Sequence, residues 1–295
     1  MSLSVQLGLL LAIATAFVSI LGFLFKHRGA RGAPEVSWRH PIRSTMALFS
    51  NRWWTIGIIV ATGSWVLHVA ALALAPITLV QTVIAGGLVL LTVVADRIFG
   101  LRVTRREWIG VALTATGLAV LAATLGGDEA KSAHSDYESG TLAAYVALLA
   151  VGSGLAMVLG ARVATHAGVF FAAAAGLQWG ASDVAIKAAT GHLGADDQLA
   201  LIAPLALVIL VLSLIGLVVS ARSLQIGDPV PVIAVTSAAA NLSTIASGLV
   251  VFGEPLPEGT FGVVLRLCAF ALVIGAASLT PAPVPVATKG RAATT

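Results

Sequence analysis

Long runs of apolar residues alternate along this chain with short polar segments. A helix that crosses the hydrocarbon core of a bilayer needs about 20 mostly apolar residues. Runs of this length predict nine spanning helices, at residues 3–25, 54–75, 77–95, 107–125, 141–161, 168–190, 199–220, 229–252 and 260–280. The pattern therefore predicts an all-α, polytopic membrane protein.

The composition supports the membrane interpretation. The chain has 295 residues, of which 58% are hydrophobic and 10% are charged, whereas soluble domains carry about 25% charged residues. The net charge of +4 could suggest a nucleic-acid partner. The basic residues instead occupy short loops between apolar runs, and no Lys/Arg block interleaved with aromatic residues occurs in the sequence. We therefore expect a lipid bilayer, and no nucleic acid, around this chain.

Loop charges predict how the chain is oriented. The loop at 26–52 is strongly basic, while the loop at 126–140 is acidic. An excess of Lys and Arg marks the cytoplasmic side. We therefore expect the N-terminus outside the cell (plasma) membrane and the C-terminus in the cytoplasm. Glu254, at the end of a span, is expected to face water, and the Pro/Ala-rich tail 281–295 is expected to be disordered.

An internal repeat is visible at a shift of 152 residues. It places ALALAPITLVQTV (71–83) on SLQIGDPVPVIAV (223–235), and LRVTRREWIGVAL (101–113) on GEPLPEGTFGVVL (253–265). Each copy contains a span, a Pro-marked turn, a second span, a polar turn and a third span. With nine spans the two copies enter the membrane from opposite sides, an arrangement typical of secondary transporters.

The repeat predicts two transmembrane halves. The first half, 1–125, has four helices and the basic cytoplasmic loop 26–52. The second half, 141–280, has five helices, and the loop 126–140 separates the two.

The repeated motifs resemble those of the drug/metabolite transporter superfamily, the EamA-like proteins built from two five-helix halves. The resemblance implies alternating-access transport of a small metabolite or a drug-like solute. The first half departs from this pattern, because it lacks a second helix and has the loop 26–52 instead. Nine spans, with Trp53 and Trp54 at the start of the second, also resemble the NIPA-like magnesium transporters. A divalent-cation transporter is therefore the alternative, and a non-transporting scaffold or partner subunit is a third interpretation.

Polar residues inside the spans are the candidates for a solute or ion pathway. A charged side chain at mid-depth costs roughly 2.5–3.5 kcal/mol, so each one needs a partner or a cavity. The rise per residue places His68, Gln81, Asp183 and Arg266 in the outer half of the membrane, and Asn241 near its midplane. The candidate pathway residues are Asp183, Arg266, His68, Gln81, Asn241 and Lys187.

Asp183 is the expected proton or cation site. It has two candidate partners, Lys187 one turn further along the same span and the distant Arg266. We expect Arg266, because an arginine cannot lose its proton and Lys187 can extend to the nearby surface. Arg266 would also hold the carboxylate of an anionic substrate. Purely structural roles remain open: an ion pair for Asp183, a core position for His68, and contacts between helices for Gln81 and Asn241.

Glycines predict helix packing on the same span. Gly176 and Gly180 form a GxxxG pair in phase with Asp183 and Lys187, which lets another helix approach closely. The sequence has no GxGxxG, Walker A, HExxH or GxSxG motif. We therefore expect neither an enzyme nor a cofactor or metal site. The expected partners are a small solute or ion and the bilayer, and a homodimer is also compatible with the sequence.

Overall fold

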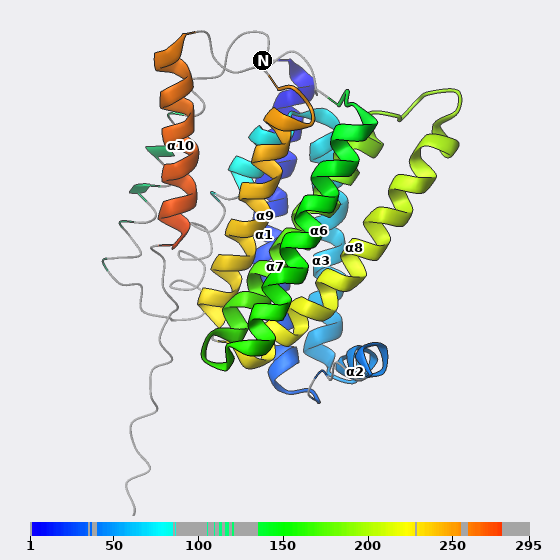
Figure 1. Ribbon diagram of the computed structural model, residues 1–295, viewed down its shortest axis with the longest axis vertical. Coiled ribbons are helices and arrows are strands. Elements are labelled where there is room, and N and C mark those ends of the chain that lie inside the picture. The colour runs from blue at the N-terminus through cyan, green and yellow to red at the C-terminus, as the bar shows by residue number, and fades with distance from the viewer. Residues whose placement is uncertain are drawn as a thin grey trace, which may run out of the picture.

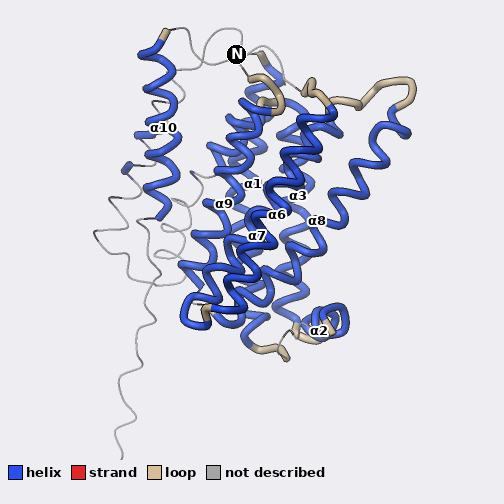
Figure 2. The backbone as a smooth tube through the Cα atoms, viewed as in Figure 1, coloured by secondary structure: helices blue, strands red, loops and turns tan. Residues whose placement is uncertain are grey.

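The computed structural model describes residues 2–34, 36, 40–84, 86, 135–227, 229–254 and 259–278, together with isolated positions between 105 and 120. Over these residues the chain is helical and contains no strand (Figure 2). The elements are α1 (Leu3–Arg31), α2 (Pro41–Leu48), α3 (Arg52–Leu74), α6 (Ser139–Arg162), the 3-10 turn η1 (Ala164–His166), α7 (Ala167–Thr190), α8 (Gln198–Ile226), α9 (Pro229–Val250) and α10 (Thr260–Ser278).

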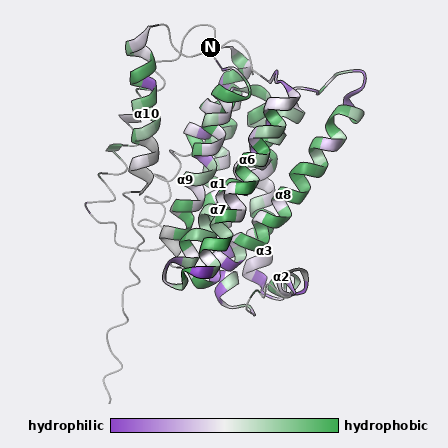
Figure 3. Cartoon of the chain, viewed as in Figure 1, coloured by the Kyte–Doolittle hydropathy of each residue, from purple (hydrophilic) through white to green (hydrophobic). Residues whose placement is uncertain are grey.

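Within the described part of the chain, five helices are long and apolar enough to cross a membrane: α1, α3, α6, α7 and α8. Apolar residues cover most of their length, and polar residues gather near their ends (Figure 3). The α8 helix turns large apolar side chains outward, and Leu199 and Leu207 are 80% and 62% exposed. An apolar surface of this extent calls for lipid around it. The described part of the chain is therefore that of a helical membrane protein.

Most of the predicted spans coincide with described helices, which are somewhat longer or shorter than expected. The α9 and α10 helices correspond to the last two spans and contain shorter apolar stretches, Val235–Val250 and Thr260–Leu272. The predicted spans 77–95 and 107–125 lie largely outside the described residues, as does the tail 281–295. The number of nine spans therefore stays a prediction.

Local sequence signals explain where the first helices begin. The Ser2 hydroxyl accepts a hydrogen bond from Val5 N at the start of α1, and Asn51 Oδ1 accepts one from Trp53 N at the start of α3. Such N-caps satisfy amide groups that have no partner within the helix. The segment 26–52 is less irregular than expected, because α1 continues to Arg31 and α2 forms within it.

The helices form two groups. In the first group α1 packs along α3, and in the second group α7 packs against α6, α8 and α9 (Figure 1). The two groups touch over a smaller surface, through α3 with α7 and α1 with α8. The α10 helix packs against α9. A polar side chain on the inner face of α7 therefore faces another helix and not lipid.

Two glycines allow the closest approach within the second group. A Cβ atom on Gly176 would lie 2.4 Å from the Thr236 carbonyl oxygen, and one on Gly180 would lie 1.9 Å from Ser243 Oγ. Both contacts are with α9, and the one at Gly176 is with backbone, so a larger side chain there would push α7 and α9 apart. This contact fixes the rotation of α7 and thereby the direction of its polar residues.

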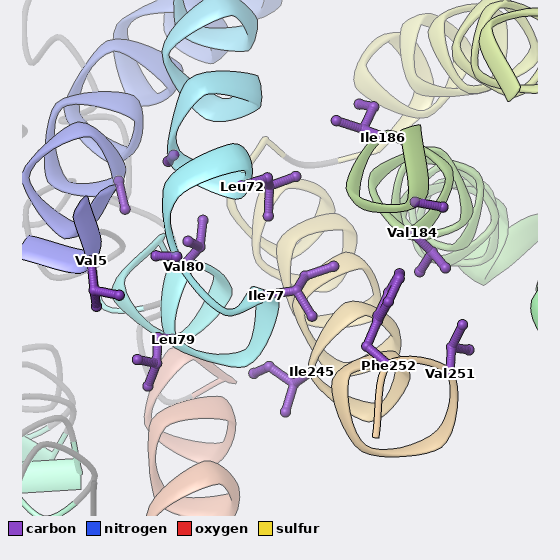
Figure 4. Close-up of a cluster of buried hydrophobic side chains, with 14 of the residues drawn as sticks. Val5, Leu72, Ile77, Leu79, Val80, Val184, Ile186, Ile245, Val251 and Phe252 are labelled. Carbon is purple, nitrogen blue, oxygen red and sulfur yellow. The ribbon is translucent and has the colours of Figure 1, made fainter. Parts of the chain in front are cut away.

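A break follows α3. The helix ends at Leu74, Ala75 and Pro76 form a turn, and residues 77–84 are helical again. Apolar side chains surround this break on both sides (Figure 4), including Leu72 on α3, Val184 on α7 and Ile245 on α9. The break is thus packed where the two groups meet, at the end of the bundle where α1 begins.

Candidate functional site

Asp183 is the centre of a polar cluster between the two helix groups. His68 Nε2 lies 2.9 Å from Asp183 Oδ1, and Gln81 Nε2 donates a hydrogen bond of 2.9 Å to Asp183 Oδ2. The three residues come from α3, the helical segment 77–84 and α7. His68 and Gln81 are buried, whereas the Asp183 side chain remains 17% exposed. The carboxylate is therefore not completely enclosed, while both of its oxygens are held.

The hydrogen-bond geometry suits an acid–base pair. When His68 Nε2 carries a proton, it donates that proton to Asp183, and the 3.5 Å contact between Gln81 Nε2 and His68 Nε2 is then not a hydrogen bond. His68 Nδ1 is buried and has no hydrogen-bond partner among the residues that the structure describes. The pair can take up one more proton, on the carboxylate or on Nδ1.

Helix geometry explains why these residues meet. His68 follows the start of α3 by 16 residues, and Asp183 follows the start of α7 by the same number. At 1.5 Å per residue both lie about 24 Å along their helices. Gln81 lies near the start of the helical segment that turns back into the bundle after Pro76. The three side chains therefore share one layer.

Lys187 lies one turn beyond Asp183 and binds the end of α3. It is fully buried, and its ammonium group donates hydrogen bonds of 2.8 Å to the Leu72 carbonyl oxygen and 2.9 Å to the Ala75 carbonyl oxygen. Within a continuous helix Leu72 would accept from residue 76, but Pro76 has no N–H. Lys187 supplies the missing donor. The expectation that Lys187 extends to the surface is therefore wrong.

Glu254 binds the other side of the same break. It is buried, and its carboxylate accepts hydrogen bonds from Ile77 N at 2.7 Å, from Thr78 N at 3.3 Å and from the Thr78 hydroxyl. A carboxylate at the first amide groups of a helix is favourable. The Lys187 ammonium and the Glu254 carboxylate also attract each other electrostatically. The expectation that Glu254 faces water is wrong, since it holds the start of the helical segment 77–84.

The remaining candidates are not the side chains that bind Asp183. Asp183 pairs with His68 and Gln81, so the expected pair with Arg266 is wrong, and so is the alternative pair with Lys187. Arg266 is buried on α10. Asn241 is buried on α9 and is not one of the side chains that bind Asp183.

The sequence interpretation missed the burial of Lys26. The apolar pattern places this residue in the basic loop 26–52, whereas the structure has it on α1 with only 6% of it exposed. One signal could have revealed it: Gly22, Lys26 and Gly29 are spaced by four and three residues, which places them on one helix face. Nothing in the sequence pointed to Glu254, because its partners Ile77 and Thr78 are 177 and 176 residues away in the chain.

No protein-family model, no curated protein and no solved structure matches this chain. The resemblances to EamA-like and NIPA-like proteins therefore stay hypotheses. The fold and the site define a class by themselves: a polytopic helical membrane protein with an acid–base pair held between two groups of helices.

Proposed function

We propose that this protein is a secondary membrane transporter that moves a small metabolite or a drug-like solute by alternating access. The observation that carries the proposal is the His68–Asp183 pair at the contact between the two helix groups. Inserting an ionisable residue into a membrane is costly, so such residues are rare. Where they occur, they mark substrate, ion or proton pathways. The Asp183 side chain is also partly exposed, as a group that exchanges protons along such a pathway must be.

The pair gives a physical means of coupling to protons. An ionised Asp183 holds His68 and Gln81 and so ties α7 to α3 and to the segment 77–84. Protonation of Asp183 removes the charge attraction across this contact and weakens both hydrogen bonds. The two groups can then move relative to each other, and release of the proton restores the contact. A proton thus shifts the balance between two arrangements of the same helices.

Helix packing supports an inverted repeat. The α3 and α8 helices run in opposite directions (Figure 1), and each is followed closely by a new helix, at residue 77 and at Pro229. A Cβ atom on Gly8 of α1 would lie 2.8 Å from Ala75 Cβ, and one on Gly168 of α7 would lie 2.6 Å from Gly227 Cα. In both groups a glycine near the start of one long helix therefore packs against the turn that follows the next long helix.

This correspondence relates α1 to α7 and α3 to α8. The helix without a counterpart is then α6, which precedes α7. The first half would lack the equivalent of α6 and not, as the resemblance implied, a second helix. The same arrangement is consistent with the orientation inferred from the loop charges, with the N-terminus outside the plasma membrane.

Magnesium transport has no such support. Magnesium favours carboxylate oxygens and retained water as ligands, whereas the two oxygens of Asp183 already face nitrogen groups of His68 and Gln81.

The proposal is tested with purified protein in two stages. Small metabolites are first screened for those that raise the thermal unfolding temperature, since a ligand bound to the folded state stabilises it. Radiolabelled hits are then followed into proteoliposomes with an inward proton gradient and without one. We expect saturable uptake that the gradient accelerates. Asp183→Asn is expected to abolish the acceleration, whereas Asp196→Asn, which changes an exposed acid before α8, is expected to keep it.

A folded protein that gives no saturable uptake with any stabilising solute would overturn the proposal in favour of a scaffold. Uptake by Asp183→Asn at the wild-type rate, with an unchanged response to the gradient, would remove the assigned role of the acid–base pair. Magnesium flux, followed with an indicator dye inside the same vesicles, is expected to equal that of protein-free vesicles.

A further inference from the structure

Lys26 is a buried cation with an unusual set of neighbours. It lies on α1 and is 6% exposed, and its ammonium group lies 4.3 Å from the centre of the Phe23 ring and 5.2 Å from that of the Trp179 ring. Within the part of the chain that the structure describes, no carboxylate or carbonyl oxygen forms an ion pair or a hydrogen bond with it. Lys187 differs, because it is equally enclosed but binds two carbonyl oxygens.

Close packing of α1 on α3 directs the Lys26 side chain toward α7. Gly57 of α3 contacts its stem, since a Cβ atom at position 57 would lie 2.8 Å from Lys26 Cγ. On the same face, Gly29 contacts the backbone of Trp54. The side chain therefore passes between the two helices, and its ammonium group reaches Trp179 on α7.

The aromatic neighbours form a fixed apolar wall. Phe23 and Trp179 meet edge to face with their centroids 5.6 Å apart, an arrangement that aromatic pairs favour. The faces of these rings attract a cation, but that attraction is weaker than the hydration that a buried ammonium group gives up. A buried charge normally has an anionic partner. An anion that arrives from outside the chain would complete the set of neighbours.

The position of Lys26 relates it to the acid–base pair. Trp179 and Asp183 are four residues apart on α7 and so lie on one face, about 6 Å apart along the helix. On α3, Gly57, which contacts the Lys26 stem, precedes His68 by 11 residues, about 16 Å along the helix. Trp179 therefore links Lys26 to the helix that carries Asp183, at a different level of the bundle from the His68–Asp183 pair.

We propose that Lys26, Phe23 and Trp179 form a binding site for an organic anion. The ammonium group of Lys26 takes the carboxylate or phosphate of the ligand, and the two rings pack against its apolar part. The inference rests on the proposed transport function in so far as the anion is the transported solute. The same chemistry is offered by the headgroup of an anionic lipid, and the experiment separates these two sources.

Benzoate is a suitable probe because it joins a carboxylate to a flat apolar ring. Its binding to the full-length protein is measured by scintillation proximity in phosphatidylcholine nanodiscs, with neutral benzamide as the competitor control. We expect saturable benzoate binding that benzamide does not displace. Lys26→Gln is expected to weaken binding by roughly tenfold or more, since a charge-assisted hydrogen bond is lost. Lys26→Arg, which keeps the charge, is expected to restore most of it.

Arg28→Gln provides the matched control. Arg28 is an exposed cation on the same helix, and its guanidinium group lies 4.0 Å from the Trp53 ring centre. This variant has the same loss of charge next to a tryptophan and is expected to bind benzoate like the wild type. Binding is measured without a proton gradient, so it can persist even if the transport proposal fails.

A second measurement covers the ligand-free protein. Lys26→Met is expected to raise the thermal unfolding temperature without benzoate, because it removes a buried charge that lacks a counter-ion. A lower unfolding temperature would show that the ammonium group is already compensated and would overturn the proposal. So would benzoate binding that is equal in the wild type and in Lys26→Gln, displacement by benzamide, or an absence of binding.

The source of the anion is read from nanodiscs that contain phosphatidylglycerol. Loss of benzoate binding there identifies a lipid headgroup as the occupant, and unchanged binding identifies a soluble anion. Gradient-driven uptake of some other solute, combined with no benzoate binding, would remove the anion site and leave the transport proposal standing.

Discussion

Lys187→Met removes the ammonium group that binds the end of α3 while keeping an unbranched side chain of similar reach. In the wild type this group donates to the carbonyl oxygens of Leu72 and Ala75 and attracts Glu254. The variant leaves two carbonyl groups without this donor and Glu254 without its positive neighbour.

The magnitude follows from these losses. Removing one member of a buried charge pair costs about 3–5 kcal/mol, and a buried polar group left without a partner costs about 1–3 kcal/mol. Glu254 keeps its hydrogen bonds from Ile77 and Thr78, which limits the total. We therefore expect Lys187→Met to lower the free energy of unfolding by about 3–5 kcal/mol, which is more than about 100-fold in the folding equilibrium.

The assay is reversible unfolding in mixed micelles of a mild detergent and dodecyl sulfate, followed by tryptophan fluorescence. Arg162→Met, at the exposed end of α6, is the control and is expected to stay within about 0.5 kcal/mol of the wild type. Glu254→Gln removes the second charge. The double variant is expected to be more stable than the sum of the two single changes predicts, by about 1–3 kcal/mol. A cost below about 1 kcal/mol for Lys187→Met, or additive effects, would refute the reasoning.

Two further predictions concern packing and orientation. Gly176→Ala is expected to destabilise the protein by about 1–3 kcal/mol, because its Cβ atom would lie 2.4 Å from the Thr236 carbonyl oxygen; Gly154→Ala, which meets nothing within 4 Å on α6, is expected to stabilise it by about 0.5–1 kcal/mol in the same unfolding assay. In a variant without the native cysteine, Ser2→Cys is expected to react with an impermeant maleimide added outside cells, and Met46→Cys on α2 is expected to react only after the membrane is opened. The reverse labelling pattern would invert the proposed orientation.

Apolar run length was sufficient to predict the helical membrane class and the positions of most described helices. It works because each spanning helix must satisfy its own backbone inside the bilayer. Depth along a helix was also informative for the site. The rise per residue places His68 and Asp183 in one layer, and the structure brings the two side chains together there.

Partner choice could not be predicted in the same way. The sequence favours Arg266 as the partner of Asp183 because both residues are placed in the outer half of the membrane and an arginine keeps its charge. The choice depends instead on which helices are neighbours: α7 contacts α3, while α10 packs against α9. Lys26 and Glu254 were misjudged because both follow apolar runs closely, and the end of a run does not mark the edge of the packed interior.

The break after α3 also has a consequence for the order in which the chain assembles. The carbonyl groups at the end of α3 receive their donors from Lys187, and the first amide groups of the segment 77–84 receive their acceptor from Glu254. Both residues are synthesised more than a hundred residues after the break. Until they arrive, the break has polar backbone groups that lipid cannot satisfy. The first half (residues 1–125) expressed alone is therefore expected to be degraded by the quality-control proteases of the membrane. Co-expression of the second half from a separate gene is expected to prevent this degradation.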